Sequence, residues 1–217
     1  GSAWSKEAAT RQHITLRWVH PDGGVTWTEQ GNSPVLNEEG ELVAIEGIAR
    51  NVTGRVLRER QLEAIAAIGS ALRGAQTRTE MLAAVLEQIL RLMEVDGAAV
   101  AMLEPASGGL HVERAVGVLA AYAGQTLPPG SWLSAEALAS GKPLLSNDVR
   151  GDPRCFHPEM MGRCTAAACS PLVAQGEIMG LLWIASERAL TDHDLRLLSA
   201  IAEMAANAIH RARLYEE

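Results

Sequence analysis

The sequence predicts an α+β fold with a mostly antiparallel central sheet, helices on one side of the sheet and a lid loop on the other. Three observations lead to this prediction. Residues 14–53 alternate apolar and polar residues with the period of β-strands, and residues 54–94 carry apolar residues at helical spacing. From residue 97 onward, short apolar strands alternate with turns until a final long helix closes the domain.

Composition and charge narrow the classes of function. Hydrophobic residues make up 47% of the 217 residues and charged residues 21%, which is an ordinary globular balance with room for one or two cores. The net charge of −7, without a clustered basic segment, argues against a nucleic-acid partner. The sequence contains no run of about 18 apolar residues, so no membrane-spanning helix is predicted. Three cysteines without an export signal favour reduced thiols and a cytoplasmic location.

The first part of the chain predicts three strands joined by polar hairpins. The strand segments are ITLRWV, VTWTEQGNSPVLN and LVAIEGIARNVT, and the turns between them are HPDGG and EEGE. Three strands bury little surface without a covering layer, so this block is too small for a whole domain. We expect residues 1–13, which begin with Gly-Ser, to be a remnant of tag removal and a lead-in segment.

The hydrophobic period changes at Gly54, and residues 56–75 are expected to form a connecting helix. Leu62, Ile65 and Leu72 lie on one stripe of this helix. An apolar stripe on a surface helix is stable only when another element covers it. The connecting helix is therefore expected to pack against a partner.

Residues 76–217 form the body of the predicted domain. Thr77 and Glu80 make a capping box that opens a helix over RTEMLAAVLEQILRLME. The strands GAAVAMLE and LHVERAVGV follow, then a short helix WLSAEALAS, a strand PLLSNDV, and a hairpin of AAACSPLVA and IMGLLWIAS. Thr191, with Asp194 three residues later, opens the C-terminal helix 192–217.

These segments resemble two known families. SAEALASGKPLLSNDVRGDPR, SPLVAQGEIMGLLWIAS and LTDHDLRLLSAIAEMAANAIHRARLYE are similar to GAF domains, and the resemblance covers residues 60–217. HPDGGVTWTEQGNSPVLNEEGELVAIEGIARNVTGR resembles the last three strands and the exit of a PAS domain, over residues 14–55. Asn51 stands where that family has Asp. The resemblance implies a GAF-like sheet preceded by a partial PAS domain and a connecting helix.

In such families, PAS and GAF modules stand upstream of an output domain such as a histidine kinase, a diguanylate cyclase or a phosphodiesterase. The resemblance therefore implies a non-catalytic sensory and dimerisation module of a cytoplasmic bacterial signal-transduction protein. The output domain is expected downstream in the same polypeptide. The sequence has no glycine-rich phosphate loop followed by Lys-Ser or Lys-Thr, and we expect no enzyme activity from it. We expect that the domain holds no cofactor. We expect that it binds a small ligand, which the sequence does not identify.

Residues 152–171 hold all three cysteines and one histidine, which raises alternatives. Cys155, His157, Cys164 and Cys169 are candidate metal ligands, but structural zinc sites usually pair ligands two to four residues apart, so no metal is expected. One alternative function is a cofactor-bearing sensor with haem, bilin or metal at Cys155 and His157. Another is a thiol redox enzyme resembling free methionine sulfoxide reductase, with Cys155 and Cys164 as its thiol pair.

The run CTAAACS on a predicted central strand is rich in small side chains, where β-branched or aromatic residues are usual. Small side chains leave volume above the sheet, which is filled either by a closely packed helix or by a ligand. A ligand pocket here would have the lid loop, residues 152–163, and the short helix near Trp132 as its rim. The expected pocket residues are Trp132, Cys155, His157, Met160, Met161, Ala168 and Ser170.

The C-terminal helix carries two adjoining apolar rows, although a helix that covers one sheet needs only one. The first row is Leu198, Ala202, Ala205 and Ile209, and the second is Leu197, Ile201, Met204 and Ala208. Either the wide stripe sinks deeper into its own domain, or one row pairs with another copy of the chain. We expect a homodimer through the first and last helices, with these interface residues: Leu62, Ile65, Leu72, Leu198, Ala202, Ala205 and Ile209.

Overall fold

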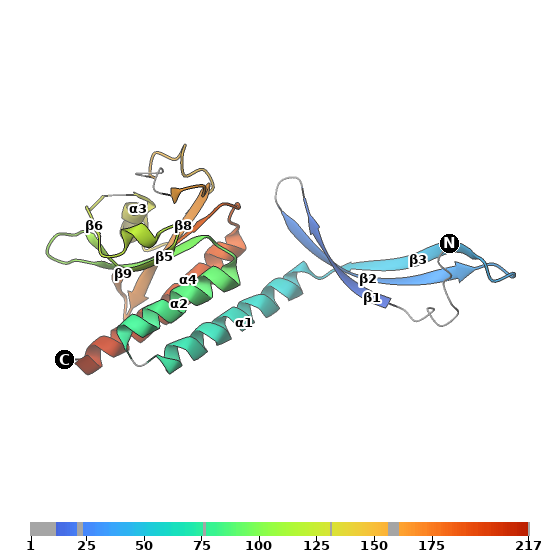
Figure 1. The fold of residues 1–217 in the computed structure, drawn as a ribbon, viewed down its shortest axis with the longest axis horizontal. Coiled ribbons are helices and arrows are strands. Elements are labelled where there is room, and N and C mark those ends of the chain that lie inside the picture. The colour runs from blue at the N-terminus through green and yellow to red at the C-terminus, as the bar shows by residue number, and fades with distance from the viewer. Residues whose placement is uncertain (1–11, 21–23, 76, 131, 156–160, 217) are drawn as a thin grey trace. The chain divides into compact units, whose positions relative to one another are not determined.

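The structure, a computed structural model, describes residues 12–20, 24–75, 77–130, 132–155 and 161–216. The chain divides into two compact units, Gly1–Arg60 and Gln61–Glu217. Figure 1 shows the strands and helices of each unit. Each unit has its own sheet and is described by itself.

The N-terminal unit contains a three-stranded antiparallel sheet in the order β1-β2-β3. Its strands are β1 Gln12–Val19, β2 Val25–Leu36 and β3 Leu42–Asn51. The central strand β2 pairs with both neighbours, and its pairing with β3 shifts register between Val35 and Leu36. The buried residue Val52 then joins β3 to the helix α1, Thr53–Gly74. The three strands and the following helix agree with the change of hydrophobic period in the sequence.

The second unit contains a six-stranded sheet in the order β6-β5-β4-β9-β8-β7, in which every pair is antiparallel. Its strands are β4 Gly97–Leu103, β5 Leu110–Gly117, β6 Thr126–Leu127, β7 Leu144–Ser146, β8 Ala166–Ala174 and β9 Glu177–Ser186. Gly180 lets β9 lie close to β4, because a Cβ there would collide with the main-chain oxygen of Ala101.

Helices cover the two faces of this sheet unequally. The helices are α2 Arg78–Met93, α3 Trp132–Ser140 and α4 Asp192–Glu216, with a 3₁₀ turn η2 at Ala120–Tyr122. α2 and α4 pack on one face, and α3 packs on the other (Figure 1). The predicted α+β fold is therefore confirmed. Within the described residues, none of the helices combines the length and hydropathy that a membrane crossing requires.

Capping side chains explain where α2 and α4 begin. Thr77 Oγ1 accepts a hydrogen bond from the main-chain nitrogen of Glu80, whose carboxylate accepts one from the nitrogen of Thr77. Thr191 and Asp194 make the same reciprocal pair before α4, with Thr191 N donating to Asp194 at 2.8 Å. These pairs satisfy N–H groups that have no partner inside the helix, so both predicted starts are confirmed.

Two apolar cores lie on opposite faces of the six-stranded sheet. The helix-side core contains side chains of α1, α2 and α4 with Ala166 and Ala168 of β8. The lid-side core contains α3, the 3₁₀ turn and the ends of the lid loop, with Ala167 and Cys169 of the same strand. Successive residues of β8 thus enter different cores. A strand that is buried on both faces is apolar at most of its positions.

The first apolar row of α4 lies inside the helix-side core. Its members, which are 0–1% exposed in a single chain, are Leu198, Ala202, Ala205 and Ile209. Leu197 and Ile201 of the second row are buried as well. The expectation that the first row contacts a second copy is therefore wrong, because β8, α2 and α1 of the same chain cover it. A helix packed between a sheet and other helices needs the wider stripe.

Candidate functional site

A small cavity lies on the lid side of the sheet, below α3. Its volume is about 20 Å³, enough for about one water molecule. The described residues that line it are Leu119, Tyr122, Leu133, Ser134, Met161, Ala167, Ala168, Cys169, Trp183 and Ile184. None of them carries a formal charge at neutral pH. The site therefore favours contact with apolar or weakly polar groups and disfavours ions.

Trp183 accounts for the small side chains around the cavity. It stands on β9 opposite Ala99 of β4 and Cys169 of β8. All three side chains are buried in the lid-side core. A small residue on either side leaves room for the indole ring. A small cavity remains beside this ring, and a ligand in it stays a prediction.

Of the two predicted pocket residues on β8, Ala168 lines the cavity and Ser170 does not. The side chain of Ala168 packs in the helix-side core, and the hydroxyl of Ser170 lies 3.4 Å from that of Ser199 on α4. Ala168 borders the cavity, but the side chains that β8 presents to the lid side are Ala167 and Cys169. Moving a strand assignment by one residue exchanges the two faces of a sheet.

The other predicted pocket residues have mixed outcomes. Met161 lines the cavity as expected, whereas Cys155 lies in the lid-side core without lining the cavity. Trp132 opens α3, but its side chain, His157 and Met160 lie outside the described residues. The cofactor alternative at Cys155 and His157 therefore stays a prediction. Among the residues that the structure describes, no three His, Cys, Asp or Glu side chains are grouped to hold a metal ion.

Sequence reasoning missed several cavity residues. Tyr122 comes from the 3₁₀ turn after β5, Leu133 and Ser134 come from α3, and Trp183 comes from β9. A signal was available for Trp183, because alternation along LLWIAS places it on the face opposite Ile184. Tyr122 had no such signal, since it follows a strand at a distance that only the folded turn determines.

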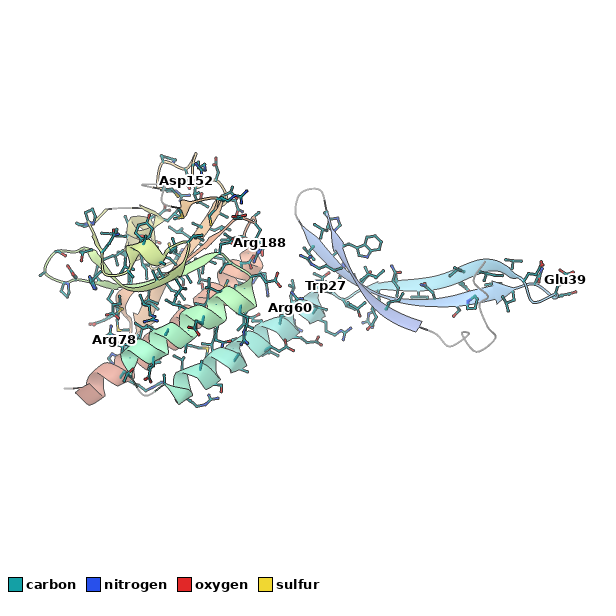
Figure 2. The ribbon with its side chains drawn as sticks, in the orientation of Figure 1. Trp27, Glu39, Arg60, Arg78, Asp152 and Arg188 are labelled. Atoms are coloured by element: carbon teal, nitrogen blue, oxygen red, sulfur yellow. The ribbon has the colours of Figure 1, made fainter. Side chains whose placement is uncertain are left out.

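Arg154 fastens the start of the lid loop to α3. Its guanidinium donates to Glu136 of α3 at 2.8 Å and to both carboxylate oxygens of Asp152 at 2.9 and 2.7 Å. These hydrogen bonds from Arg154 hold the pKa of Asp152 (Figure 2) well below its usual range, so its carboxylate stays charged. Arg150 adds a second tie, by donating to the main-chain oxygen of Gly162 at 2.8 Å.

The three thiols are buried and unpaired by disulfides. Burial raises the pKa of Cys164 to about 11 and that of Cys169 to about 12. Burial and the nearby Asp152 carboxylate raise the pKa of Cys155 as well. Because the thiolate is the reactive form, all three cysteines are held in their unreactive state at neutral pH.

Comparison with known proteins gives the family. Residues 75–210 match the family model of the GAF domain. No curated protein matches the chain. The GAF domain of a phosphoenolpyruvate-protein phosphotransferase from Coxiella burnetii has a TM-score of 0.67 at 18% identity, over 73% of this chain and 97% of that chain.

Two further solved structures are similar. Free methionine-R-sulfoxide reductase from Neisseria meningitidis has a TM-score of 0.63 at 19% identity, over 71% of this chain and 91% of that chain. A domain of a two-component sensor histidine kinase from Sinorhizobium meliloti has a TM-score of 0.52 at 19% identity, over 65% and 96% respectively. At these identities the likeness concerns the fold alone. With the family match over most of its length and the same fold, the chain belongs to the GAF domain family.

Proposed function

We propose that the chain is a non-catalytic sensory module of a cytoplasmic bacterial signalling protein, and that the lid-side cavity binds its ligand. The observation that supports this most is the charge-free cavity under α3, bordered by a loop that Arg154 fastens to that helix. A ligand that separates α3 from the sheet acts on the ion pair between Arg154 and Glu136. The cavity and the Arg154–Glu136 ion pair are thus mechanically connected.

The lining favours a small, uncharged and largely apolar ligand. Ser134 offers a hydroxyl, and Cys169 remains a neutral thiol because burial raises its pKa to about 12. A charged ligand would lose its hydration without gaining a partner of opposite charge in the described lining. The present volume of about 20 Å³ requires Met161 or α3 to move when such a ligand binds.

The thiols support a non-catalytic assignment. A reductase of this fold needs a thiolate to attack and a second thiol to resolve the intermediate. In this chain the three cysteines are buried with raised pKa values. The proposed role is therefore binding, and the structural likeness to a methionine sulfoxide reductase is one of fold.

Assembly and context complete the proposal. The sheet of residues 14–55 is consistent with the last strands of a PAS domain, and an output domain such as a histidine kinase belongs downstream in the same polypeptide. α1 remains the proposed dimer helix, because Leu62 is 62% exposed and Ile65 and Leu72 are only half-buried. Two copies would cover these side chains by pairing α1 in parallel. A small shift or rotation of that pair would carry the signal.

The test is a thermal-shift screen of small uncharged aromatic and aliphatic compounds, followed by calorimetry of any compound that raises Tm. Ala167→Val adds bulk on the cavity side of β8, and Ala166→Val adds the same bulk on the helix side. We expect the Ala167 variant to lose at least tenfold in ligand affinity and the Ala166 variant to retain it. A ligand that binds both variants equally well would contradict the proposed cavity.

A further inference from the structure

The two faces of the N-terminal sheet differ completely in charge. Strand alternation and register place Arg17, Glu29, Glu46 and Arg50 on one face, which we call the charged face. The opposite face, which we call the neutral face, carries Ile14, Leu16 and Trp18 of β1, Thr26, Thr28, Gln30, Asn32 and Pro34 of β2, and Ile45, Gly47, Ala49 and Asn51 of β3. None of the residues named for the neutral face is charged.

The charged face already has neighbours from its own unit. The guanidinium of Arg60 lies over the ring of Trp27, 4.9 Å from its centre (Figure 2), and Arg55 donates to Glu29 at 3.1 Å. Thr53 Oγ1 accepts a hydrogen bond from the main-chain nitrogen of Trp27 at 2.8 Å. The first turns of α1 are therefore fixed on this side of the sheet.

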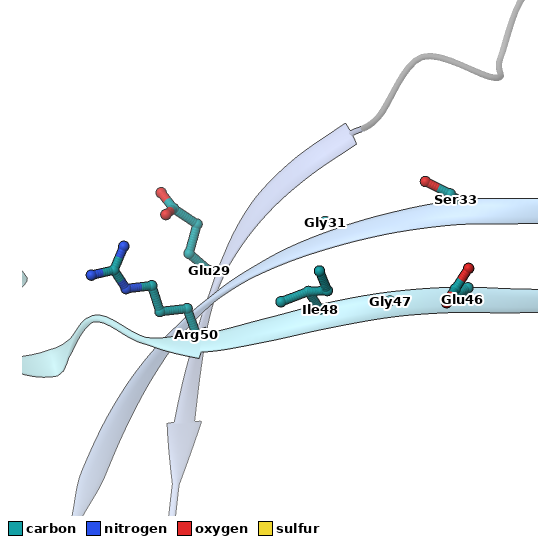
Figure 3. Close-up of a pocket in the computed structure, with 7 residues that line it drawn as sticks. All are labelled: Glu29, Gly31, Ser33, Glu46, Gly47, Ile48 and Arg50. Atoms are coloured by element: carbon teal, nitrogen blue, oxygen red, sulfur yellow. The ribbon is translucent and has the colours of Figure 1, made fainter.

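Beyond α1, the charged face forms an open hollow of about 330 Å³. Figure 3 shows Glu29 and Arg50 extending from neighbouring strands beside it, with Ile48 and Ser33 further along. Ile48 is 75% exposed, but it stands in the same strand between two charged residues, Glu46 and Arg50. Charged neighbours keep such a side chain solvated and discourage packing against an apolar surface.

The neutral face has large apolar side chains without charged neighbours on the same face. Ile45 is 62% exposed, Trp18 51% and Ile14 44%. They stand on the two outer strands, on either side of the threonines and amides of β2. Exposed apolar groups that are gathered on one face without charges are typical of an interaction surface.

Side chains in the middle of the neutral face lie close to the strands. Gly47 stands opposite Asn32, and the Asn32 side chain lies where a Cβ on Gly47 would be. Trp18 is also held against the sheet, because its indole nitrogen donates to Thr28 Oγ1 at 2.8 Å. These contacts keep the amide and the indole close to the strands.

We propose that the neutral face docks on the neutral face of a second copy of the chain, sheet against sheet. Self-association places no charge in the contact, so no ion is desolvated without a partner. All three strands lie side by side only at Thr28–Asn32 of β2, and the 30 residues of the three strands, of 8, 12 and 10 residues, give a face of about 480 Å² from strand dimensions. Two such faces would bury on the order of 1,000 Å², which is the area that a specific interface needs as a minimum. This surface includes no residue of the lid-side cavity, and it is an alternative to the proposed pairing of α1, because the first turns of α1 lie on the opposite face of the sheet.

The experiment compares two isoleucines of β3 that lie three residues apart on opposite faces. Ile45→Lys places a charge on the neutral face, and Ile48→Lys places the same charge on the charged face. Both are run as the full chain by size exclusion with light scattering at micromolar concentration, and circular dichroism checks that they fold. We expect a dimeric wild type, a dimer at least tenfold weaker for Ile45→Lys, and no change for Ile48→Lys.

Further variants separate this inference from the proposed α1 pairing. Ile14→Lys, on β1 of the neutral face, should weaken the dimer as Ile45→Lys does and replaces it if that variant does not fold. A monomeric wild type overturns the inference. So does a dimer that Leu62→Glu abolishes while Ile45→Lys and Ile14→Lys leave it intact, because α1 alone then holds the two copies together.

Discussion

Arg188 and Asp194 form a two-pronged ion pair that ties the start of α4 to the end of α2. The guanidinium of Arg188 donates to the two carboxylate oxygens of Asp194 at 3.1 and 2.8 Å. It also donates to the main-chain oxygen of Met93 at 2.7 Å. One side chain thus satisfies a helix-capping carboxylate and an end carbonyl of another helix at the same time.

Replacing Arg188 by alanine should therefore destabilise the domain. Asp194 would remain largely buried without its cation, and Met93 would lose its donor. We expect a loss of about 1–2 kcal/mol in the free energy of unfolding, toward the lower end for charged hydrogen bonds because the guanidinium is partly exposed. Urea denaturation measures it. Arg196→Ala, an exposed arginine on the same helix, should change the stability by less than about 0.5 kcal/mol. Equal effects of the two changes would contradict the role of the pair.

The same pair predicts how stability responds to acid. Burial tends to raise the pKa of Asp194, but hydrogen bonds from Arg188 and Thr191 outweigh it and lower the pKa below its ordinary value. The folded pKa thus lies below the unfolded value of about 3.9, so the stabilisation is complete above that pH and is lost as the pH falls through the folded pKa.

Urea midpoints at pH 6, 4 and 3 test this dependence. The wild type should lose more stability between pH 4 and 3 than Asp194→Asn does. Asp192→Asn is measured beside it as the same substitution at an exposed position in the first turn of the same helix. Parallel profiles for wild type and Asp194→Asn would show that another group is responsible.

The cysteines should react slowly in the native protein. Burial with raised pKa values leaves little thiolate at neutral pH. With a thiol-specific reagent at pH 7.5, we expect all three to react at least tenfold more slowly than a cysteine introduced by Ser140→Cys at an exposed position on α3. A native thiol that matches the introduced one would favour the redox alternative, and Cys→Ser variants would then identify it.

Gly180 should tolerate no side chain. A Cβ there meets the main-chain oxygen of Ala101, which cannot move without separating β9 from β4. We expect Gly180→Ala to cost about 2–3 kcal/mol, as overpacking of a core does. Gly54→Ala is the matched control, because nothing lies within 4 Å of its added methyl group in α1. Thermal unfolding of the two variants compares them, and a Gly180→Ala protein as stable as Gly54→Ala would show that the strands can separate.

Local signals in the sequence predicted much of the fold. The capping pairs Thr77/Glu80 and Thr191/Asp194 are complete within four residues, so their geometry depends little on the rest of the chain. The strands of the first unit are flanked by polar turns and alternate, which fixes their ends and their faces. Features that depend only on residues close together in the sequence were therefore predicted correctly.

The failures concern residues whose neighbours are distant in sequence. In AAACS every side chain is small and both faces of β8 are buried, so nothing in the run shows that Ala167 and not Ala168 faces the lid side. The apolar row through Ala202 and Ala205 has the same spacing whether it faces a second copy or its own sheet. Only the assembled helix layer shows that it faces the sheet.

The alternation of β8 has a mechanical consequence. β8 alone separates the two cores at this point, with the side chain of Cys169 in the lid-side core and that of Ala168 in the helix-side core. α4 lies directly on the far side, and its contact with β8 is close because both surfaces are made of small side chains such as Ala202 and Ala205. Such a contact has little slack to absorb movement. A ligand that enlarges the cavity would therefore displace α4 as a whole. No series of side-chain rearrangements between the cavity and α4 would be needed.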